Sequence, residues 1–292
     1  MNNRSKVTKL TTTKNQNKKN SSTTSATLTT ENYYSLESDR VWQSKTRFRE
    51  FEDCEAAALA QLEGRWNPDS NVEVLLVGNY LHSYFESKEA HQRFLEENSK
   101  AIYKYGKPEK GIKSSFRQAD SMIDALEADA NFNRLYQGEK EVVVKGELYG
   151  VQWKGKIDCL NLDRGMFMDL KTVDDIHKKH WDVDSHQYVS FPLDRSYDLQ
   201  MAIYRELIHQ QFDVWCDPYI IAVSKQVVPD KGIYSIPDYL MQERLGQVEM
   251  DQPRIESVIH HEEEPIRCEH CDYCRLTKTL DEVIPIDEIE LY

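Results

Sequence analysis

The stretch from Gly155 to Thr172 constrains this chain more than any other, because it reads as two short strands joined by a turn. The turn signal is the run 161–165, which is rich in Asn, Asp and Gly. Side chains alternate between the two faces of a strand, so we expect Asp169 and Lys171 to point the same way. Leu170, between them, then points into the core.

Asp158 ends the first of these strands and is expected to lie beside Asp169 and Lys171. Two carboxylates can hold a hard cation such as Mg²⁺, and a lysine can orient a nucleophilic water near a phosphate. The stretch therefore predicts a divalent-metal site. A solvated hairpin with ordinary surface charges fits the same residues, and only the rest of the chain can distinguish the two interpretations.

Composition and net charge limit the classes of function that this chain can have. The chain has 292 residues, of which 39% are hydrophobic and 30% charged, and its net charge is -13. This charge argues against a protein that coats nucleic acid, but not against a nuclease, whose metal-binding carboxylates are acidic and whose groove can be locally basic. No apolar run approaches the roughly 20 residues of a membrane span and no signal peptide is visible, so we expect a cytoplasmic protein with no membrane partner.

Residues 1–35 are predicted to be a disordered tail, because they are rich in Ser, Thr, Asn and Lys and have few apolar side chains. The tail is basic, so both a weak nonspecific contact with DNA and simple solvation fit it. We expect the remaining residues, 36–292, to form one domain.

Apolar spacing predicts the main elements of that domain. Helices are expected over 45–64, 72–86, 116–136 and 197–212 and from 237 to about 245, and strands over 141–145, 148–153 and 218–224. Residues 173–194 are expected to be irregular. Their mixture of aromatic and basic side chains fits either a plain surface loop or a grip on a nucleic-acid strand.

His82 lies on the same face of its expected helix as Gly78 and Glu86. A glycine inside a helix suggests a close backbone approach, and a neutral imidazole can complete a metal site. A packed histidine without a ligand role also fits. Glu139, Glu141 and Glu147 are further carboxylates that fit either a metal ligand or an exposed strand-edge charge.

The cysteines indicate metal or redox chemistry more than disulfides, because the chain is expected in the cytoplasm. Cys268, Cys271 and Cys274 form two successive CxxC steps, which is a strong ligand signal. Three cysteines need a fourth ligand, and Cys54 is the natural candidate if its helix packs nearby. Two more cysteines are expected to be structural, namely Cys159 and Cys216.

Taken together, these motifs resemble the PD-(D/E)XK nucleases, in particular the RecB-like branch with its exonuclease VIII-type phage and bacterial recombination nucleases. The resemblance covers about residues 45–280 and rests on four motifs in the order of that family. They are Gly78-x-x-x-His82, Gly155-x-Ile-Asp158, Asp169-Leu-Lys171-Thr and Gln200-x-x-x-Tyr204. The cysteines resemble the iron–sulfur staple of RecB-type nucleases.

The resemblance implies an α/β fold with a restriction-endonuclease-like core, a mixed central sheet flanked by helices, and a C-terminal Cys cluster. It implies that His82, Asp158 and Asp169 bind Mg²⁺ or Mn²⁺ and that Lys171 is the catalytic lysine. Gln200 and Tyr204 match the motif that positions the DNA strand. The cluster ligands of a 4Fe-4S centre would be Cys54, Cys268, Cys271 and Cys274.

The chain departs from the family pattern at three points. Ile157 stands where the nominal motif has proline, the second acid is Asp169 rather than Glu, and the CxxCxxC spacing is tighter than in several iron–sulfur relatives. The last departure leaves Zn²⁺ as the alternative metal of the cysteines, with His260, His261 or His270 as further ligands.

The resemblance implies a metal-dependent deoxyribonuclease, an exonuclease acting on duplex ends or single strands in DNA recombination or repair. A single-strand-annealing recombination protein is the expected partner, in a bacterial or phage-infected cell. Two alternatives remain, a catalytically silent DNA-binding scaffold with an Fe-S or Zn staple and a structure-specific endonuclease of the same fold.

Overall fold

The structure is a computed structural model that describes residues 27–68, 72–182, 185–280 and 283–289. Most of the basic tail predicted over 1–35 therefore lies outside the described residues. The last part of that tail, from residue 27 on, is described. There, Leu28 and Tyr33 are buried with Trp42 in a small apolar cluster beside Val143. A short helix, α1 (Leu36–Asp39), follows directly.

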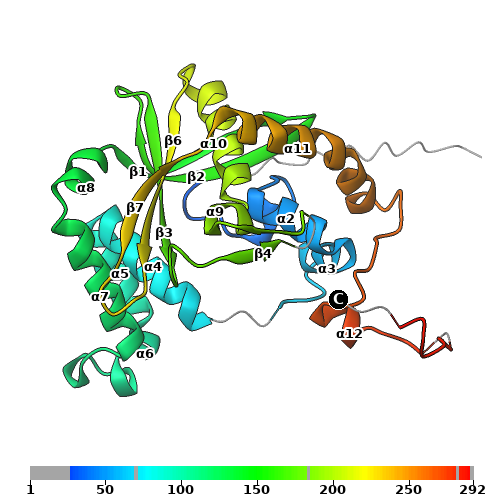
Figure 1. The fold of residues 1–292 in the computed structure, drawn as a ribbon, viewed down its shortest axis with the longest axis horizontal. Coiled ribbons are helices and arrows are strands. Elements are labelled where there is room, and N and C mark those ends of the chain that lie inside the picture. The colour runs from blue at the N-terminus through cyan, green and yellow to red at the C-terminus, as the bar shows by residue number, and fades with distance from the viewer. Residues whose placement is uncertain (1–26, 69–71, 183–184, 281–282, 290–292) are drawn as a thin grey trace, which may run out of the picture.

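A five-stranded mixed sheet forms the centre of the fold, with the strand order β1-β2-β3-β6-β7 (Figure 1). Its strands are β1 (Glu139–Leu148), β2 (Val151–Asn161), β3 (Met166–Val173), β6 (Asp217–Ser224) and β7 (Lys231–Ser235). All neighbours are antiparallel except β3 and β6, which are parallel. A parallel pair needs a long crossover, and here α10 (Tyr197–Phe212) is its longest helix.

The segment between β3 and α10 is less irregular than expected. It holds a small hairpin, β4 (His180–Asp182) and β5 (Gln187–Val189), and one helical turn, α9 (Phe191–Asp194). Trp181 and Tyr188 lie opposite each other in this hairpin and are both exposed. The aromatic side chains expected in this segment are thus on its surface.

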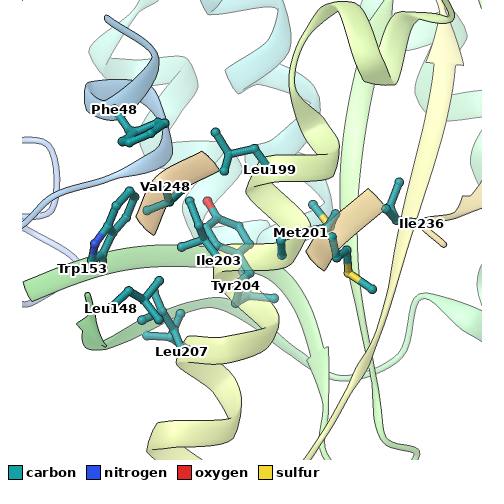
Figure 2. Packing of buried hydrophobic residues seen from close by; sticks show 14 of the residues in the cluster. Phe48, Leu148, Trp153, Leu199, Met201, Ile203, Tyr204, Leu207, Ile236 and Val248 are labelled. Carbon is teal, nitrogen blue, oxygen red and sulfur yellow. The ribbon is translucent and has the colours of Figure 1, made fainter. Parts of the chain in front are cut away.

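One face of the sheet packs against α10, α11 (Asp238–Ile259), α2 (Lys45–Asp53) and α3 (Glu55–Leu62). Figure 2 shows part of this core, which includes Phe48 of α2, Trp153 of β2 and Leu207 of α10. The Phe48 and Trp153 rings are 5.8 Å apart. Leu199, Ile203 and Leu207, which sequence spacing predicted as the stripe of α10, are all fully buried in this core.

The other face is covered by a second layer of helices. These are α4 (Val72–Glu86), α5 (Lys88–Glu97), α6 (Ser99–Ile102), α7 (Ser114–Glu127) and α8 (Ala130–Leu135), with two short 3-10 turns, η1 (Lys104–Gly106) and η2 (Pro108–Lys110). Leu81, Phe116 and Met122 form a core there with Leu170 of β3. The predicted fold class, α/β with a mixed central sheet flanked by helices, is confirmed.

Two expected helices are interrupted. The helix predicted over 45–64 breaks at Cys54, whose backbone is extended with φ −166° and ψ 104° and caps α3. The helix predicted over 116–136 is α7 followed by α8, with Asp129 capping the second helix through its side chain. The last helix continues well beyond 245, through Pro253, and a further short helix, α12 (Asp272–Leu276), follows the CxxC steps.

Within the described part of the chain, every helix is too short or too polar to traverse a bilayer.

Candidate active site

Strands β2 and β3 pair over only three residues before they separate. Their ladder ends at Cys159 and Met168, although each strand continues on its other edge. At the point of separation, Asp158 Oδ2 accepts a hydrogen bond of 2.7 Å from the backbone N–H of Leu170. A side-chain carboxylate thus replaces the next rung of the ladder and is fixed between the strands.

His82 and Glu141 converge on Asp158 from different elements. The His82 Nδ1 to Asp158 Oδ2 distance is 3.4 Å. One ligand atom from each of His82, Glu141 and Asp158 lies within 4.8 Å of the other two. An imidazole and two carboxylates make a donor set that suits Mg²⁺ or Mn²⁺, so the residues fit the expected metal.

Glu141 reaches this position through an unusual backbone. Its φ is +54° inside β1, in the left-handed region that non-glycine residues rarely adopt. Its neighbours pair in regular register with β2, which places Glu141 opposite Asp158. Glu141 Oε2 also forms an ion pair of 2.5 Å with Lys156 Nζ. Strained backbone in a cleft is a common mark of functional sites.

Asp169 lies on β3, one residue before the Leu170 that Asp158 binds. Its Oδ2 is 2.6 Å from Lys171 Nζ, and its Oδ1 accepts a hydrogen bond of 2.6 Å from Gln200 Nε2. Asp169 is only 2% exposed. The alternation of β3 therefore places Asp169 and Lys171 together, as expected, with Leu170 in the opposite core.

The charges of the site perturb one another. Burial raises the pKa of Asp158, but the charge and hydrogen bond of His82, together with the Lys171 charge and the Leu170 N–H, hold that pKa below its ordinary value. Burial lowers the pKa of His82, but the Asp158 carboxylate raises it above its ordinary value. Burial also raises the pKa of Asp169, against the opposing charge of Lys171.

These side chains line a groove of about 900 Å³. The position of Tyr204 in this groove requires a glycine at residue 155, because a Cβ there would lie 2.7 Å from the Tyr204 ring. Tyr204 is buried with its ring close to this glycine. At Gly78 a Cβ would meet Thr172 Oγ1 at an ordinary 3.8 Å, so the close approach expected there is not tight.

A second group forms about the cysteines. One sulfur atom from each of Cys54, Cys268, Cys271 and Cys274 lies within 4.8 Å of the others. The Cys54 and Cys274 sulfurs are 3.6 Å apart, although they are 220 residues apart in the chain. Burial raises the pKa of the Cys268 thiol, but backbone N–H groups of His270 and Cys271 lower it to about 6. Four convergent thiols suit zinc or an iron–sulfur cluster.

Residues 44–277 match the family described as PDDEXK-like domain of unknown function (DUF3799). The chain belongs to this PDDEXK-like family. The match includes both the carboxylate site and the cysteine group. The predicted assignment to the PD-(D/E)XK nucleases is confirmed, and the predicted nuclease class with it.

A solved structure similar to this chain is that of a protein from Eubacterium rectale described as a "Putative exonuclease". It is 35% identical, the match covers 89% of this chain and 97% of that chain, and the TM-score is 0.81. A solved structure of SSO0001 matches over 71% of this chain and 95% of that chain, with 13% identity and a TM-score of 0.31. No curated protein matches.

The structure brings together most of the residues that the sequence singled out. His82 and Asp158 are in contact, and Lys171 contacts Asp169. Asp169 itself is held by Lys171 and Gln200, and the third member of the convergent donor set is Glu141. All four predicted cysteines meet, and the described residues of their group include no histidine. Cys159 and Cys216 are buried elsewhere.

Gln200 and Tyr204, which match the motif expected to position DNA, both line the groove. The Gln200 side chain donates a hydrogen bond to Asp169, and Tyr204 is 8% exposed. Of the histidines considered as zinc ligands, His261 pairs with Glu63 at 3.1 Å and His260 with Glu256 at 3.6 Å.

Sequence reasoning missed several polar residues of the groove, among them Lys45, Lys156 and Tyr197. Lys156 had a usable signal, because it precedes Asp158 by two residues in a strand. Lys45 had none, since a lysine at the start of a helix is ordinary. Glu141 was named only as one of several spare carboxylates.

Proposed function

We propose that this protein is a Mg²⁺- or Mn²⁺-dependent exonuclease that hydrolyses DNA phosphodiester bonds from duplex ends. The observation that carries the proposal is the separation of β2 and β3, which gathers His82, Asp158, Asp169 and Lys171 in one groove. The description of the Eubacterium rectale relative as a "Putative exonuclease" supports the same activity.

In the proposed site, His82, Asp158 and Asp169 would hold the metal ion, and Glu141, which converges with His82 and Asp158, would add a further carboxylate. A bound divalent ion polarises the phosphate and lowers the pKa of a water molecule. Leu170 N–H keeps the Asp158 carboxylate oriented, and Gln200 does the same for Asp169. Such outer hydrogen bonds set ligand orientation in metal sites.

Lys171 stabilises charge on the reacting phosphate or on the attacking hydroxide. Burial lowers the pKa of its ammonium, but the Asp169 carboxylate and other groups raise it above its ordinary value. The side chain is therefore a fixed cation at neutral pH. A preorganised cation of this kind acts on developing charge without reorganising.

The cysteine group is proposed to hold a 4Fe-4S cluster, with Zn²⁺ as the alternative. Cys54 immediately precedes α3, and the other three cysteines lie near the C-terminus. A metal bound by all four would therefore link the two ends of the domain. Protein purified without oxygen is expected to be brown, with iron–sulfur charge-transfer absorbance. A colourless protein that contains stoichiometric zinc would overturn the iron–sulfur assignment.

The biological setting is proposed to be DNA recombination or repair, with a single-strand-annealing protein as partner. The test of the activity is digestion of end-labelled linear duplex, single strand and closed circle in Mg²⁺ or Mn²⁺. Loss of label from linear duplex and an intact circle are expected. Cutting of the circle would instead support the endonuclease alternative.

Variants tie that activity to the site. Asp158→Asn and Asp169→Asn are expected to abolish digestion, as is EDTA. Asp163→Asn is the matched control, because Asp163 lies exposed in the turn between the same two strands. If wild-type protein cuts no substrate with either metal, the catalytically silent scaffold becomes the better description.

A further inference from the structure

Two lysine ammonium groups share one aromatic ring at the wall of the groove. Lys171 Nζ of β3 lies 4.5 Å from the centre of the Tyr197 ring, and Lys45 Nζ of α2 lies 5.5 Å from it. All three residues line the groove. The electron-rich face of a tyrosine ring attracts cations, so Tyr197 orders both ammonium groups.

The two lysines differ in their partners. Lys171 is paired with the Asp169 carboxylate at 2.6 Å. Lys45 instead donates a hydrogen bond of 2.7 Å to the backbone carbonyl of Arg195. Among the residues that the structure describes, no carboxylate pairs with Lys45 at ion-pair distance. Its positive charge is therefore positioned but not neutralised.

The surroundings make that charge unfavourable without an anion. Burial lowers the pKa of Lys45, and the nearby Lys171 and Arg49 lower it further, to about 8, while Asp169 and Asp198 act in the opposite direction. An incoming anion would offset both the desolvation and the repulsion between the cations. Lys45 also begins α2, so the positive end of that helix faces the same part of the groove.

We propose that Lys45 is a second phosphate-binding residue, which contacts a DNA phosphate beside the one held at Lys171. The inference rests on the proposed function, because the ligand is a phosphate group of DNA. Tyr197 is then a positioning residue for both cations. The phosphate is either an internal phosphodiester of the strand or the terminal phosphate of its end.

The test is DNA binding with Ca²⁺ in place of Mg²⁺, measured over a range of salt concentrations. Lys45→Met is expected to weaken binding about tenfold or more, the loss of one hydrogen bond to a charged group. The slope of log affinity against log salt should fall by about one, as for a single lost phosphate contact. Lys45→Arg should restore both, since the charge and donor are kept.

Lys110→Met is the matched control, because Lys110 is exposed in η2 and does not line the groove. It removes the same charge and should leave affinity and salt slope close to wild type. Thermal melting of Lys45→Met should match wild type, which separates loss of binding from loss of fold.

Comparison of duplexes with phosphorylated and unphosphorylated ends identifies the phosphate. If Lys45→Met loses the same affinity for both duplexes, the phosphate is an internal phosphodiester. If it loses affinity only for the duplex with phosphorylated ends, the phosphate is the terminal group. If wild type binds DNA and Lys45→Met binds with the same affinity and slope, the inference is wrong and the proposed function stands. Failure of wild type to bind any DNA would instead count against the proposed function.

Discussion

Gln200 donates a hydrogen bond of 2.6 Å from its side-chain nitrogen to Asp169, so an amide of α10 fixes a carboxylate of β3. From this contact we expect Gln200 to orient Asp169, whereas the motif that Gln200 matches implies a contact with DNA. An amide that orients a metal-binding acid acts on metal affinity, whereas a DNA contact acts on DNA affinity.

Gln200→Ala is therefore expected to raise the Mg²⁺ concentration needed for half-maximal cleavage, by about ten- to a hundredfold. DNA affinity measured without divalent metal should stay at the wild-type value. The measurement is cleavage rate against Mg²⁺ concentration, together with DNA titrations in EDTA. Weaker DNA binding with an unchanged Mg²⁺ dependence would instead support the strand-positioning role.

Glu141 offers a second test of the metal site. Its carboxylate lies near His82 and Asp158 and also pairs with Lys156. Glu141→Gln keeps the size of the side chain and removes the charge. If Glu141 shares the metal ion, the Mg²⁺ requirement should rise about tenfold. Glu139→Gln, at an exposed position of the same strand, is the control. Equal Mg²⁺ curves for both variants would restrict Glu141 to its pairing with Lys156.

Much of the site was predictable because it is local. The turn at 161–165 and the alternation of Asp169, Leu170 and Lys171 depend on neighbouring residues only, and the structure has both. The apolar spacing of 197–212 likewise predicts α10 at the bounds that it has. The family was inferred from four weak motifs that occur in the order of that family. No single one of these motifs would have identified it.

The remainder depends on contacts that are distant in sequence. Good helix formers lie on both sides of Cys54, so nothing local predicts the break in the helix there. The break places the Cys54 sulfur beside that of Cys274, which is 220 residues later in the chain. The left-handed backbone of Glu141 has no local signal either. Strand β7 was missed because its residues alternate between exposed and half-buried positions, without an apolar run.

Cys54 supplies the third prediction. Cys54→Ala removes one of four convergent ligands and the only one from the N-terminal half of the chain, so metal content and thermal stability should both fall. Cys216→Ala removes a buried thiol outside the group and should leave metal content at the wild-type level. Elemental analysis and thermal melting of the two variants provide the comparison. Full metal content in Cys54→Ala would remove Cys54 from the ligand set.

Lys154 of β2 is a lysine that is only 1% exposed. Its ammonium donates to Tyr33 O, Ser38 Oγ and Asp39 Oδ1, at 2.5, 2.9 and 2.7 Å. These bonds attach the segment that contains α1 to β2. Lysine at this position thus has a structural function.

Lys154→Met is expected to lower the free energy of unfolding by about 3 kcal/mol, because it leaves buried acceptors and part of the Asp39 charge without a partner. Asp39 keeps its contact with Arg47 at 3.2 Å, which limits the loss. Urea denaturation measures the change. Lys178→Met, at an exposed position, should stay within about 0.5 kcal/mol of wild type. Equal midpoints for the two variants would show that the segment is held by its apolar contacts.

Lys45 makes DNA affinity depend on pH. Its pKa in the free protein is lowered to about 8, first by burial and then by Lys171. A bound phosphate favours the charged form, so the pKa in the complex must be higher than in the free protein. Below pH 8 both states hold the proton and affinity is flat. Above pH 8 the free protein loses the proton first, so DNA binding takes one up and weakens as pH rises.

The expected result is a loss of about tenfold in affinity for each pH unit above 8, until the pKa of the complex is reached. Titrations in Ca²⁺ from pH 7 to about 9.5 would measure it. Lys45→Arg should stay flat over this range, because a guanidinium keeps its charge throughout. Lys45→Met should also be flat, at the weaker affinity. A decline of equal slope in all three proteins would assign the titration to another group and leave Lys45 without a role in it.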